Sequence, residues 1–307
     1  MKPTAKHLLL AAIFFLFLAV VGVFYKPKQN QQITALHSSA IILSNDKIKT
    51  ASSPQNSAPL SIPPGAKTLN MPILMYHHVG TLPDNANKTR GDLTVPTQNF
   101  SDQVKWLSDN GYHSVSLEDV YLYSQGKFSM PANPVVFTFD DGYSDVFQNA
   151  IPILKQYGFS GSFAIITNNP GTVQGTNSYA SWDDIKTAQD NGMEIACHTQ
   201  NHFDGSSTTF SADYILNNLT NCKNTLAANG INTNILVYPF GHYTPLYLQQ
   251  AKAAGFVVGV TVHEGQQINL TDLMQLPRVR VHGAETLQRF EDVILGRART
   301  QISLNTK

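Results

Sequence analysis

The sequence has no excess of charge of either sign and very little cysteine. Its 307 residues contain 21 lysines and arginines against 21 aspartates and glutamates. Such a balance argues against binding to nucleic acid through a basic surface, so we expect no nucleic-acid partner. A neutral polymer fits this charge balance better as a partner. The two cysteines, Cys197 and Cys222, allow no more than one disulfide.

Charged side chains are absent from Leu8 to Tyr25, directly after a short basic N-terminal stretch. About 18 residues at ~1.5 Å each are just enough to cross a hydrocarbon core of ~30 Å as a helix. Small residues, which a cleaved secretory signal needs at its end, are also scarce, since residues 20–25 offer only Gly22. We therefore expect residues 1–25 to form an uncleaved signal anchor, with a cleaved peptide and a secreted protein as the alternative.

A sustained apolar period is missing from residues 26–70, which are rich in Gln, Asn, Ser, Pro and Lys. Such a composition cannot bury enough apolar surface to offset the entropy of ordering the chain, so we expect a flexible linker. Residues 71–307, about 237 in number, fit one large α/β domain. A single N-terminal span before a long domain favours placement of that domain outside the cytoplasm, although lysines on both flanks weaken the positive-inside rule.

Within residues 71–307, strand-like apolar runs alternate with segments of helical period. This alternation favours a mostly parallel sheet or barrel with helices outside it, in which a site forms at the carboxyl ends of the strands. The expected strands are 72–79, 112–116, 134–139, 162–166, 193–197, 235–238, 256–262 and 278–281, and the expected helices are 100–109, 117–124, 146–157, 181–190, 214–228, 245–254 and 285–297.

Two adjacent carboxylates, Asp140 and Asp141, end the apolar run 134–139 and precede Gly142. Side chains alternate along a regular strand, but at a strand end both acids can face one cleft. Close carboxylates are costly unless a proton or a cation neutralises one of them, so we expect a metal nearby. The alternative is that the two acids simply cap the following segment, as Asp often does in turns.

Two histidines, His198 and His202, follow the strand 193–197 at a spacing of four. In a helical or tightly turned segment they share one face, and neutral imidazole is the commonest metal-binding side chain. Together with the acid pair they predict a divalent ion held by one Asp and two His, with positions left open for water and substrate.

Two further histidines, His77 and His78, end the strand 72–79 and are either functional or structural. The polar segments 81–97 and 168–179 are expected to be loops, and the first is long enough to form part of a substrate rim.

Three motifs together resemble those of the polysaccharide deacetylases with a NodB-homology domain, carbohydrate esterase family four: Thr-Phe-Asp-Asp-Gly at 138–142, His-Thr-x-x-His at 198–202 and Tyr-Pro-Phe-Gly at 238–241. Met-Tyr-His-His-Val at 75–79 and Trp182 are most similar to the branch of the poly-N-acetylglucosamine deacetylases. The resemblance covers about 71–295. It implies a distorted (β/α) barrel of about seven repeats that hydrolyses N-acetyl groups of a cell-surface or cell-wall polysaccharide, here on the bacterial cytoplasmic membrane.

The resemblance also implies roles for individual residues. Asp140 is the general base, and Asp141, His198 and His202 hold the metal, which is most often zinc. Such an ion polarises the acetamide carbonyl and lowers the pKa of water, and the backbone N–H near Phe240 meets the developing oxyanion.

Two roles are less directly matched. Many members carry an arginine shortly before the third motif that orders the base, but residues 234–237 contain none. Arg280, or alternatively Arg278, is expected to act from the last strand instead. The general acid is expected to be His77, with His282 as the alternative.

The cysteines are expected to remain unpaired, because Cys197 belongs to an apolar strand beside the presumed ligands and buried free cysteines are common. The alternative is a disulfide between them, which is possible outside the cytoplasm. Two other classes of function stay open: a two-histidine, one-carboxylate iron oxygenase, which the alternating strands and helices oppose, and an inactive glycan-binding protein that keeps the fold. Poly-N-acetylglucosamine, peptidoglycan and chitin-like oligomers are all candidate substrates, and the sequence predicts no oligomeric state.

Overall fold

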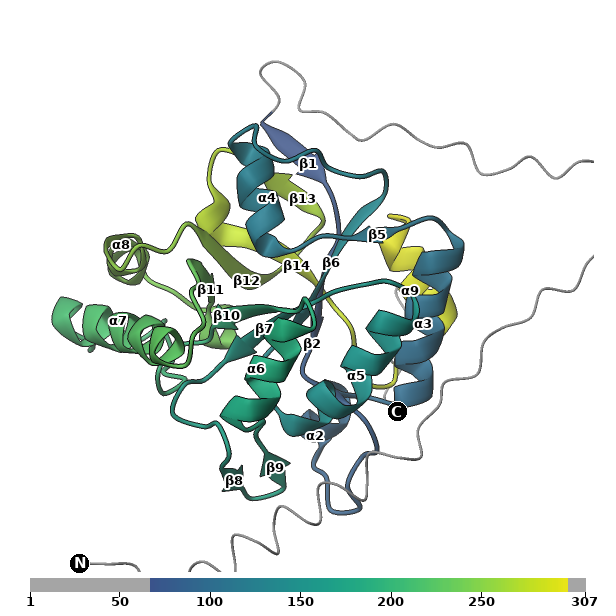
Figure 1. The fold of residues 1–307 in the computed structure, drawn as a ribbon, viewed down its shortest axis with the longest axis horizontal. Helices are drawn as coiled ribbons and strands as arrows, with labels where there is room; N and C mark the ends of the chain where they lie inside the picture. Colours follow the sequence, from purple (N-terminus) through teal and green to yellow (C-terminus); the bar gives the residue numbers. More distant parts are fainter. Residues whose placement is uncertain (1–66, 298–307) are drawn as a thin grey trace, which may run out of the picture. The chain divides into compact units, whose positions relative to one another are not determined.

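Seven parallel strands close into a barrel in the computed structural model, which describes residues 67–297 (Figure 1). Around the barrel the strands follow chain order, and the last pairs with β2, which also pairs with β6. The strands are β2 (Ile73–Tyr76), β6 (Pro134–Phe139), β7 (Ser162–Ile165), β10 (Glu194–Cys197), β11 (Ile235–Val237), β12 (Val258–Glu264) and β14 (Leu276–Arg280). The predicted barrel of about seven repeats is confirmed, with β5 (His113–Ser114) as an additional strand paired to β6.

Helices connect the consecutive barrel strands from β2 to β12 and pack around the barrel (Figure 1). The link from β12 to β14 departs from this pattern, because it contains no α-helix, only β13 (Gln267–Asn269) and the short η3 (Leu273–Gln275). The α-helices are α2 (Lys88–Leu93), α3 (Thr97–Asp109), α4 (Leu117–Ser124), α5 (Ser144–Gln156), α6 (Trp182–Asp190), α7 (Ala212–Ala228), α8 (Pro245–Ala253) and α9 (Leu287–Ile294).

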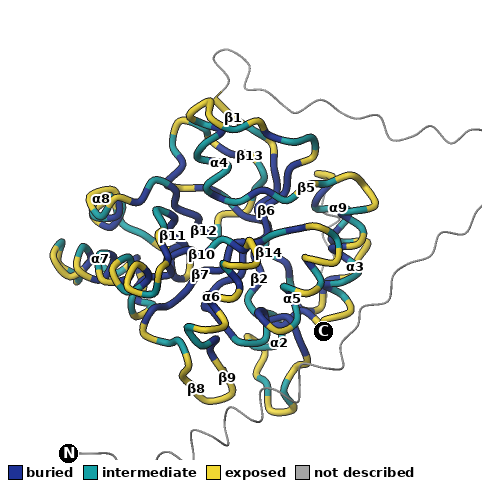
Figure 2. The backbone as a smooth tube through the Cα atoms, in the orientation of Figure 1, coloured by how far each residue is buried: buried dark blue, intermediate teal, exposed yellow. Residues whose placement is uncertain are grey.

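The strands are buried on both faces, which is why their sequences are continuous apolar runs rather than alternating ones (Figure 2). Along β6, Val135, Phe137 and Phe139 face the helices, whereas Val136 joins the core inside the barrel. The barrel interior is therefore a packed core rather than an open channel.

Helix α4 closes the amino-terminal end of the barrel. Leu117 and Val120 belong to the same core as the barrel interior. The carboxylate of Glu194, at the start of β10, accepts the N–H groups of Leu117 (3.0 Å) and Glu118 (2.8 Å), which have no partner within the helix. With this end closed, the carboxyl ends of the strands form the open end of the barrel.

Several local predictions need correction. The single strand expected over 72–79 is divided into β2 and β3 (His78–Val79), and β3 pairs with β4 (Thr94–Val95). The expected loop 81–97 contains α2 and β4, and the loop 168–179 contains a hairpin of β8 (Val173–Gln174) and β9 (Asn177–Ser178). Short strands of two residues have no detectable period, so the pattern could not indicate them.

The folded domain also begins before Met71. Strand β1 (Thr68–Asn70) pairs antiparallel with β13, so the last residues of the predicted linker are ordered by a partner almost 200 positions away. The predicted anchor at 1–25 and the rest of the linker lie outside the described residues. Within residues 67–297, none of the helices is long and apolar enough to cross a membrane.

Candidate active site

Asp141, His198 and His202 converge at the carboxyl end of the barrel. Oδ1 of Asp141 lies 3.2 Å from Nε2 of His198 and 3.1 Å from Nε2 of His202. The three donor atoms lie within 4.8 Å of one another, which is close enough to share one metal ion. The structure thus brings together side chains that are some sixty positions apart in the sequence.

The chemistry of this cluster fits a divalent cation. Oδ1 of Asp141 is buried and has no hydrogen-bond partner, although both ring nitrogens are near it. Nδ1 of His198 donates to the carbonyl of Val237 at 2.7 Å, which leaves the Nε2 lone pair directed toward the cluster. Burial opposes ionisation of Asp141, but the two imidazoles outweigh it and hold the pKa of the carboxyl well below its usual range. One carboxylate oxygen with two imidazole nitrogens is a common donor set for zinc.

The backbone around the cluster is held in an unusual conformation. Among the described residues, five other than glycine have a positive φ, and four of them are Asp141 (74°), Thr199 (65°), His202 (58°) and Phe240 (57°). Such conformations are costly and concentrate at functional sites, where the surrounding structure maintains them. At Asp141 the positive φ turns the chain immediately after β6, which explains how two adjacent carboxylates reach the same end of the barrel.

Asp140 is buried but remains outside the metal cluster, because Arg278 binds it. The guanidinium donates from both terminal nitrogens, Nη1 to Oδ1 at 2.7 Å and Nη2 to Oδ2 at 2.8 Å. Nε of Arg278 donates to the carbonyl of Thr261 at 2.6 Å, so the fork is fixed on both sides. Burial raises the pKa of Asp140, but Arg278, together with His77 and His198, lowers it more, and the net pKa is below its usual value. Asp140 is therefore a carboxylate at neutral pH.

The expectation that Arg280 binds Asp140 is wrong, and the alternative Arg278 makes that contact instead. Nη2 of Arg280 binds Oδ2 of Asp92 at 2.7 Å at the rim. Arginines two apart on a strand share a face, so the spacing could not distinguish them. Their depth in the barrel distinguishes the two arginines. Arg278 lies two residues before Arg280 on β14, deeper in the barrel, and its side chain extends through the interior to Asp140.

The two candidate acids occupy different positions. Nε2 of His77 lies 3.8 Å from Oδ2 of Asp140. Burial lowers the pKa of His77, and the nearby carboxylates oppose this only in part. His282 instead contacts Asp92, with Nδ1 at 2.8 Å from Oδ1. His78 has a structural role, since it is buried and its Nδ1 lies 2.8 Å from Oδ2 of Asp145.

Phe240 lies in the short 3₁₀ turn η2 (Pro239–Gly241) after β11. Its side chain is exposed, and its ring centroid is 4.7 Å from that of His202. Gly241 is needed here, because a Cβ at this position would lie 2.4 Å from the backbone nitrogen of Val262. The turn therefore brings the side chain of Phe240 against a histidine of the metal cluster.

Two tyrosines that the sequence did not indicate as site residues lie beside the cluster. Tyr143 and Tyr179 are buried, and their ring centroids are 5.1 Å apart. Burial and the charge of Asp141 both raise the pKa of each phenol, so both stay neutral. The position of Tyr143 directly after Gly142 was an available signal, but Tyr179 comes from the β9 end of a loop whose path was unknown.

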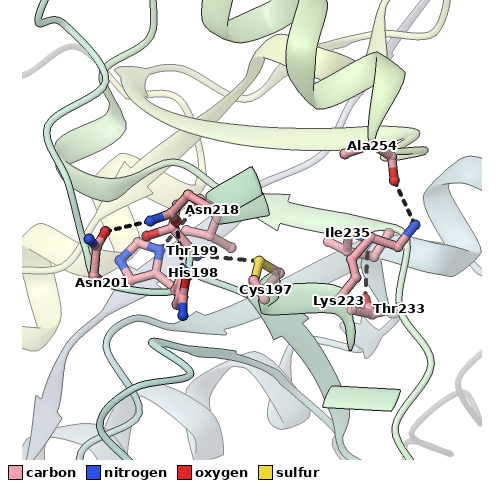
Figure 3. Close-up of a disulfide and its surroundings, with 12 residues drawn as sticks. Cys197, His198, Thr199, Asn201, Asn218, Lys223, Thr233, Ile235 and Ala254 are labelled. Carbon is pink, nitrogen blue, oxygen red and sulfur yellow. Dashed lines mark hydrogen bonds between the residues drawn. A yellow bond between two sulfur atoms is a disulfide. The ribbon is translucent and has the colours of Figure 1, made fainter. Parts of the chain in front are cut away.

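The cysteines are not free, contrary to expectation. Cys197 at the end of β10 forms a disulfide with Cys222 on α7 (Figure 3). The prediction failed because α7 packs on β10 with Cys222 on the contacting face, a pairing that the local sequence does not reveal.

Comparisons with known proteins agree with this site. A family model described as polysaccharide deacetylase matches residues 127–259. YxkH of Bacillus subtilis (strain 168), provisionally named a polysaccharide deacetylase, is 30% identical over 217 residues, which cover 70% of this chain and 72% of YxkH. Poly-β-1,6-N-acetyl-D-glucosamine N-deacetylase of Staphylococcus aureus (strain MRSA252) is 25% identical over 206 residues, which cover 64% of this chain and 71% of that protein.

A solved structure extends the comparison to the fold. The Streptococcus pyogenes deacetylase PplD, in complex with acetate, matches with a TM-score of 0.65 at 28% identity and covers 74% of this chain and 98% of its own. The closed parallel barrel with acidic and histidine side chains at its carboxyl end is that of a (β/α) barrel enzyme. The chain belongs to the polysaccharide deacetylase family, with the NodB-homology domain of carbohydrate esterase family four, and its class of reaction is hydrolysis.

Proposed function

We propose that this protein is a metal-dependent N-deacetylase that removes acetyl groups from N-acetylglucosamine units of poly-N-acetylglucosamine. The observation that carries the proposal is that two adjacent acids have different partners. Arg278 binds Asp140, whereas Asp141 lies with His198 and His202 in the metal cluster. The named activity of the Staphylococcus aureus relative supports this polymer over peptidoglycan and chitin-like oligomers.

Asp141, His198 and His202 would hold the ion, and their donor set suits Zn²⁺. When bound there, it would polarise the acetamide carbonyl and lower the pKa of the attacking water. Asp140, kept ionised by Arg278, takes a proton from that water as it attacks the carbonyl carbon.

The remaining steps use the residues around Asp140. The backbone N–H of Phe240 donates to the oxygen on which negative charge develops. His77, next to Asp140, donates a proton to the amine nitrogen as the C–N bond breaks. Because burial lowers its pKa, His77 is neutral before the reaction, and the proton that it donates is the one that Asp140 has taken from the water and passed to Nε2 of His77.

Acetate release from acetylated glucosamine oligomers tests the proposal. We expect the full chain to release acetate, to lose activity with a chelator and to recover it with zinc. A panel of β-1,6-linked oligomers, chitin oligomers and peptidoglycan tests the substrate, and the β-1,6-linked oligomers should give the highest kcat/KM. Release of no acetate from any of them would favour the glycan-binding alternative, and activity that needs dioxygen would favour an oxygenase.

Replacing His77 by alanine should lower kcat by two or more orders of magnitude while bound zinc is unchanged, because proton donation to the leaving amine is lost. The matched variant His282→Ala should change kcat less than tenfold, because His282 contacts Asp92 rather than Asp140. Steady-state kinetics and metal analysis of both variants decide the assignment. Near-normal turnover of His77→Ala would transfer the role to His282.

We further propose that residues 1–25 anchor the protein in the bacterial cytoplasmic membrane with its catalytic domain outside the cytoplasm. The uncharged stretch from Leu8 to Tyr25 supports an anchor, and a disulfide is most stable outside the reducing cytoplasm. Recovery of the full-length protein in the soluble cytoplasmic fraction would contradict this placement.

A further inference from the structure

The loop that bears both metal-cluster histidines is attached to one face of α7. Cys197 is joined to Cys222, and Oδ1 of Asn218 accepts the backbone N–H of Gln200 at 2.9 Å. Nδ2 of Asn218 donates to Oδ1 of Asn201 at 2.7 Å (Figure 3). Asn218 and Cys222 are four residues apart on the helix, so the covalent and the hydrogen-bonded attachment lie side by side on one face.

Asn218 is a buried polar residue inside a helix, and the structure of the helix itself does not require it. The residue is 4% exposed, and asparagine has a low helix propensity. Both ends of its amide are occupied by the histidine loop, the oxygen by Gln200 and the nitrogen by Asn201. A buried amide is tolerated only when its hydrogen bonds are made. The hydrogen bonds to the histidine loop therefore explain why an asparagine occupies position 218.

The loop needs such support because its backbone is strained. Thr199 is β-branched and has a φ of 65°, and His202 has a φ of 58°. The N–H of Thr199 donates to Sγ of Cys197 at 3.3 Å, and its Oγ1 accepts the N–H of His202 at 2.9 Å. The backbone that directs both imidazoles is thus connected through Thr199 to the disulfide.

We infer that Asn218 and the Cys197–Cys222 disulfide are positioning groups for the metal site. They hold the strained loop so that Nε2 of both histidines meets Oδ1 of Asp141 before an ion binds. This inference rests on the metal dependence proposed above. Groups that orient ligands in this way typically change metal affinity 10- to 100-fold when they are removed.

The test compares Asn218→Ala with Asn217→Ala in the full chain. Asn217 is the same residue type at the adjacent position of α7, but it is exposed. We expect Asn218→Ala to bind zinc 10- to 100-fold more weakly, measured by competition with a chromophoric chelator, and to alter the visible absorption spectrum of the Co²⁺-loaded protein. Asn217→Ala should leave both unchanged, and Asn218→Asp, which keeps an acceptor for Gln200, should recover part of the affinity.

The double variant Cys197→Ala/Cys222→Ala provides an independent measurement if Asn218→Ala does not fold. It should also weaken zinc binding and change the Co²⁺ spectrum. Wild-type zinc affinity and spectrum in the folded variants, even with a lower unfolding temperature, would overturn the inference, as would failure of both variants to fold. Absence of zinc binding by the wild type would instead contradict the proposed function.

Discussion

Replacement of Asp140 by asparagine is expected to lower kcat/KM for acetylated glucosamine oligomers by about three orders of magnitude without loss of bound metal. Asparagine has nearly the same shape, but it cannot take a proton from the attacking water. The metal should remain, because Asp140 binds Arg278 and is outside the cluster of Asp141 with the two histidines. Acetate-release kinetics and zinc analysis on the same preparation measure both quantities.

Two further variants show what each outcome means. Asp141→Asn should lose both activity and zinc, since it removes the anionic donor of the cluster. Asp204→Asn changes a rim carboxylate that contacts His242, and it should alter kcat/KM less than threefold. Loss of zinc from Asp140→Asn would show that Asp140 is a ligand, and retained activity would show that another group is the base.

The catalytic core of the site could be predicted because its signals are local. A buried parallel strand is a continuous apolar run, so the ends of β6 and β10 were visible in the sequence. Parallel strands place their carboxyl ends at the same side of the barrel, so Asp141 and the two histidines were expected to meet. No knowledge of the loops between them was needed.

Other features depend on contacts that local sequence does not encode. The choice between Arg278 and Arg280 depends on depth inside the closed barrel, because both lie on the same face of β14. The pairing of β1 with β13 and the disulfide of Cys197 with Cys222 each need a partner brought near by the fold.

The backbone conformation at Asp141 is another feature that the local sequence could not predict. The sequence indicated that Asp140 and Asp141 could share a cleft at the end of a strand. It did not indicate how, and the structure shows that a positive φ of 74° at Asp141 turns the chain there. The free-energy cost of that conformation is offset by packing with residues distant in the sequence, so a short motif cannot reveal it.

Replacement of Arg278 by methionine is expected to lower kcat/KM about 100-fold near neutral pH and to move the acidic limb of its pH profile upward. In the wild type, burial raises the pKa of Asp140, and Arg278 with smaller contributions from His77 and His198 lowers it below its usual value. Without the guanidinium, burial is opposed much less, so the pKa of Asp140 rises. The carboxyl is then protonated, and inactive as a base, over a higher range of pH. The pH dependence of kcat/KM measures this shift.

Stability gives a second readout with a defined sign. Removing one partner of a buried ion pair costs about 3–5 kcal/mol of unfolding free energy, because the remaining charge is buried without compensation. In Arg278→Met burial is opposed only by His77 and His198, so we expect the folded-state pKa of Asp140 to rise above its unfolded value. The loss of stability is then present above that pKa and shrinks as pH falls through it. Chemical denaturation of both proteins at several pH values measures the difference.

Arg280→Met is the matched control, since it removes the same side chain from the same strand but from a partner at the rim, Asp92. Its acidic limb should coincide with that of the wild type. A shift caused by Arg280→Met and absent from Arg278→Met would reverse the assignment of the base-ordering arginine. Equal shifts in both would mean that Asp140 responds to the total positive charge near the end of β14, and the bidentate contact would then have no special part in keeping the base ionised.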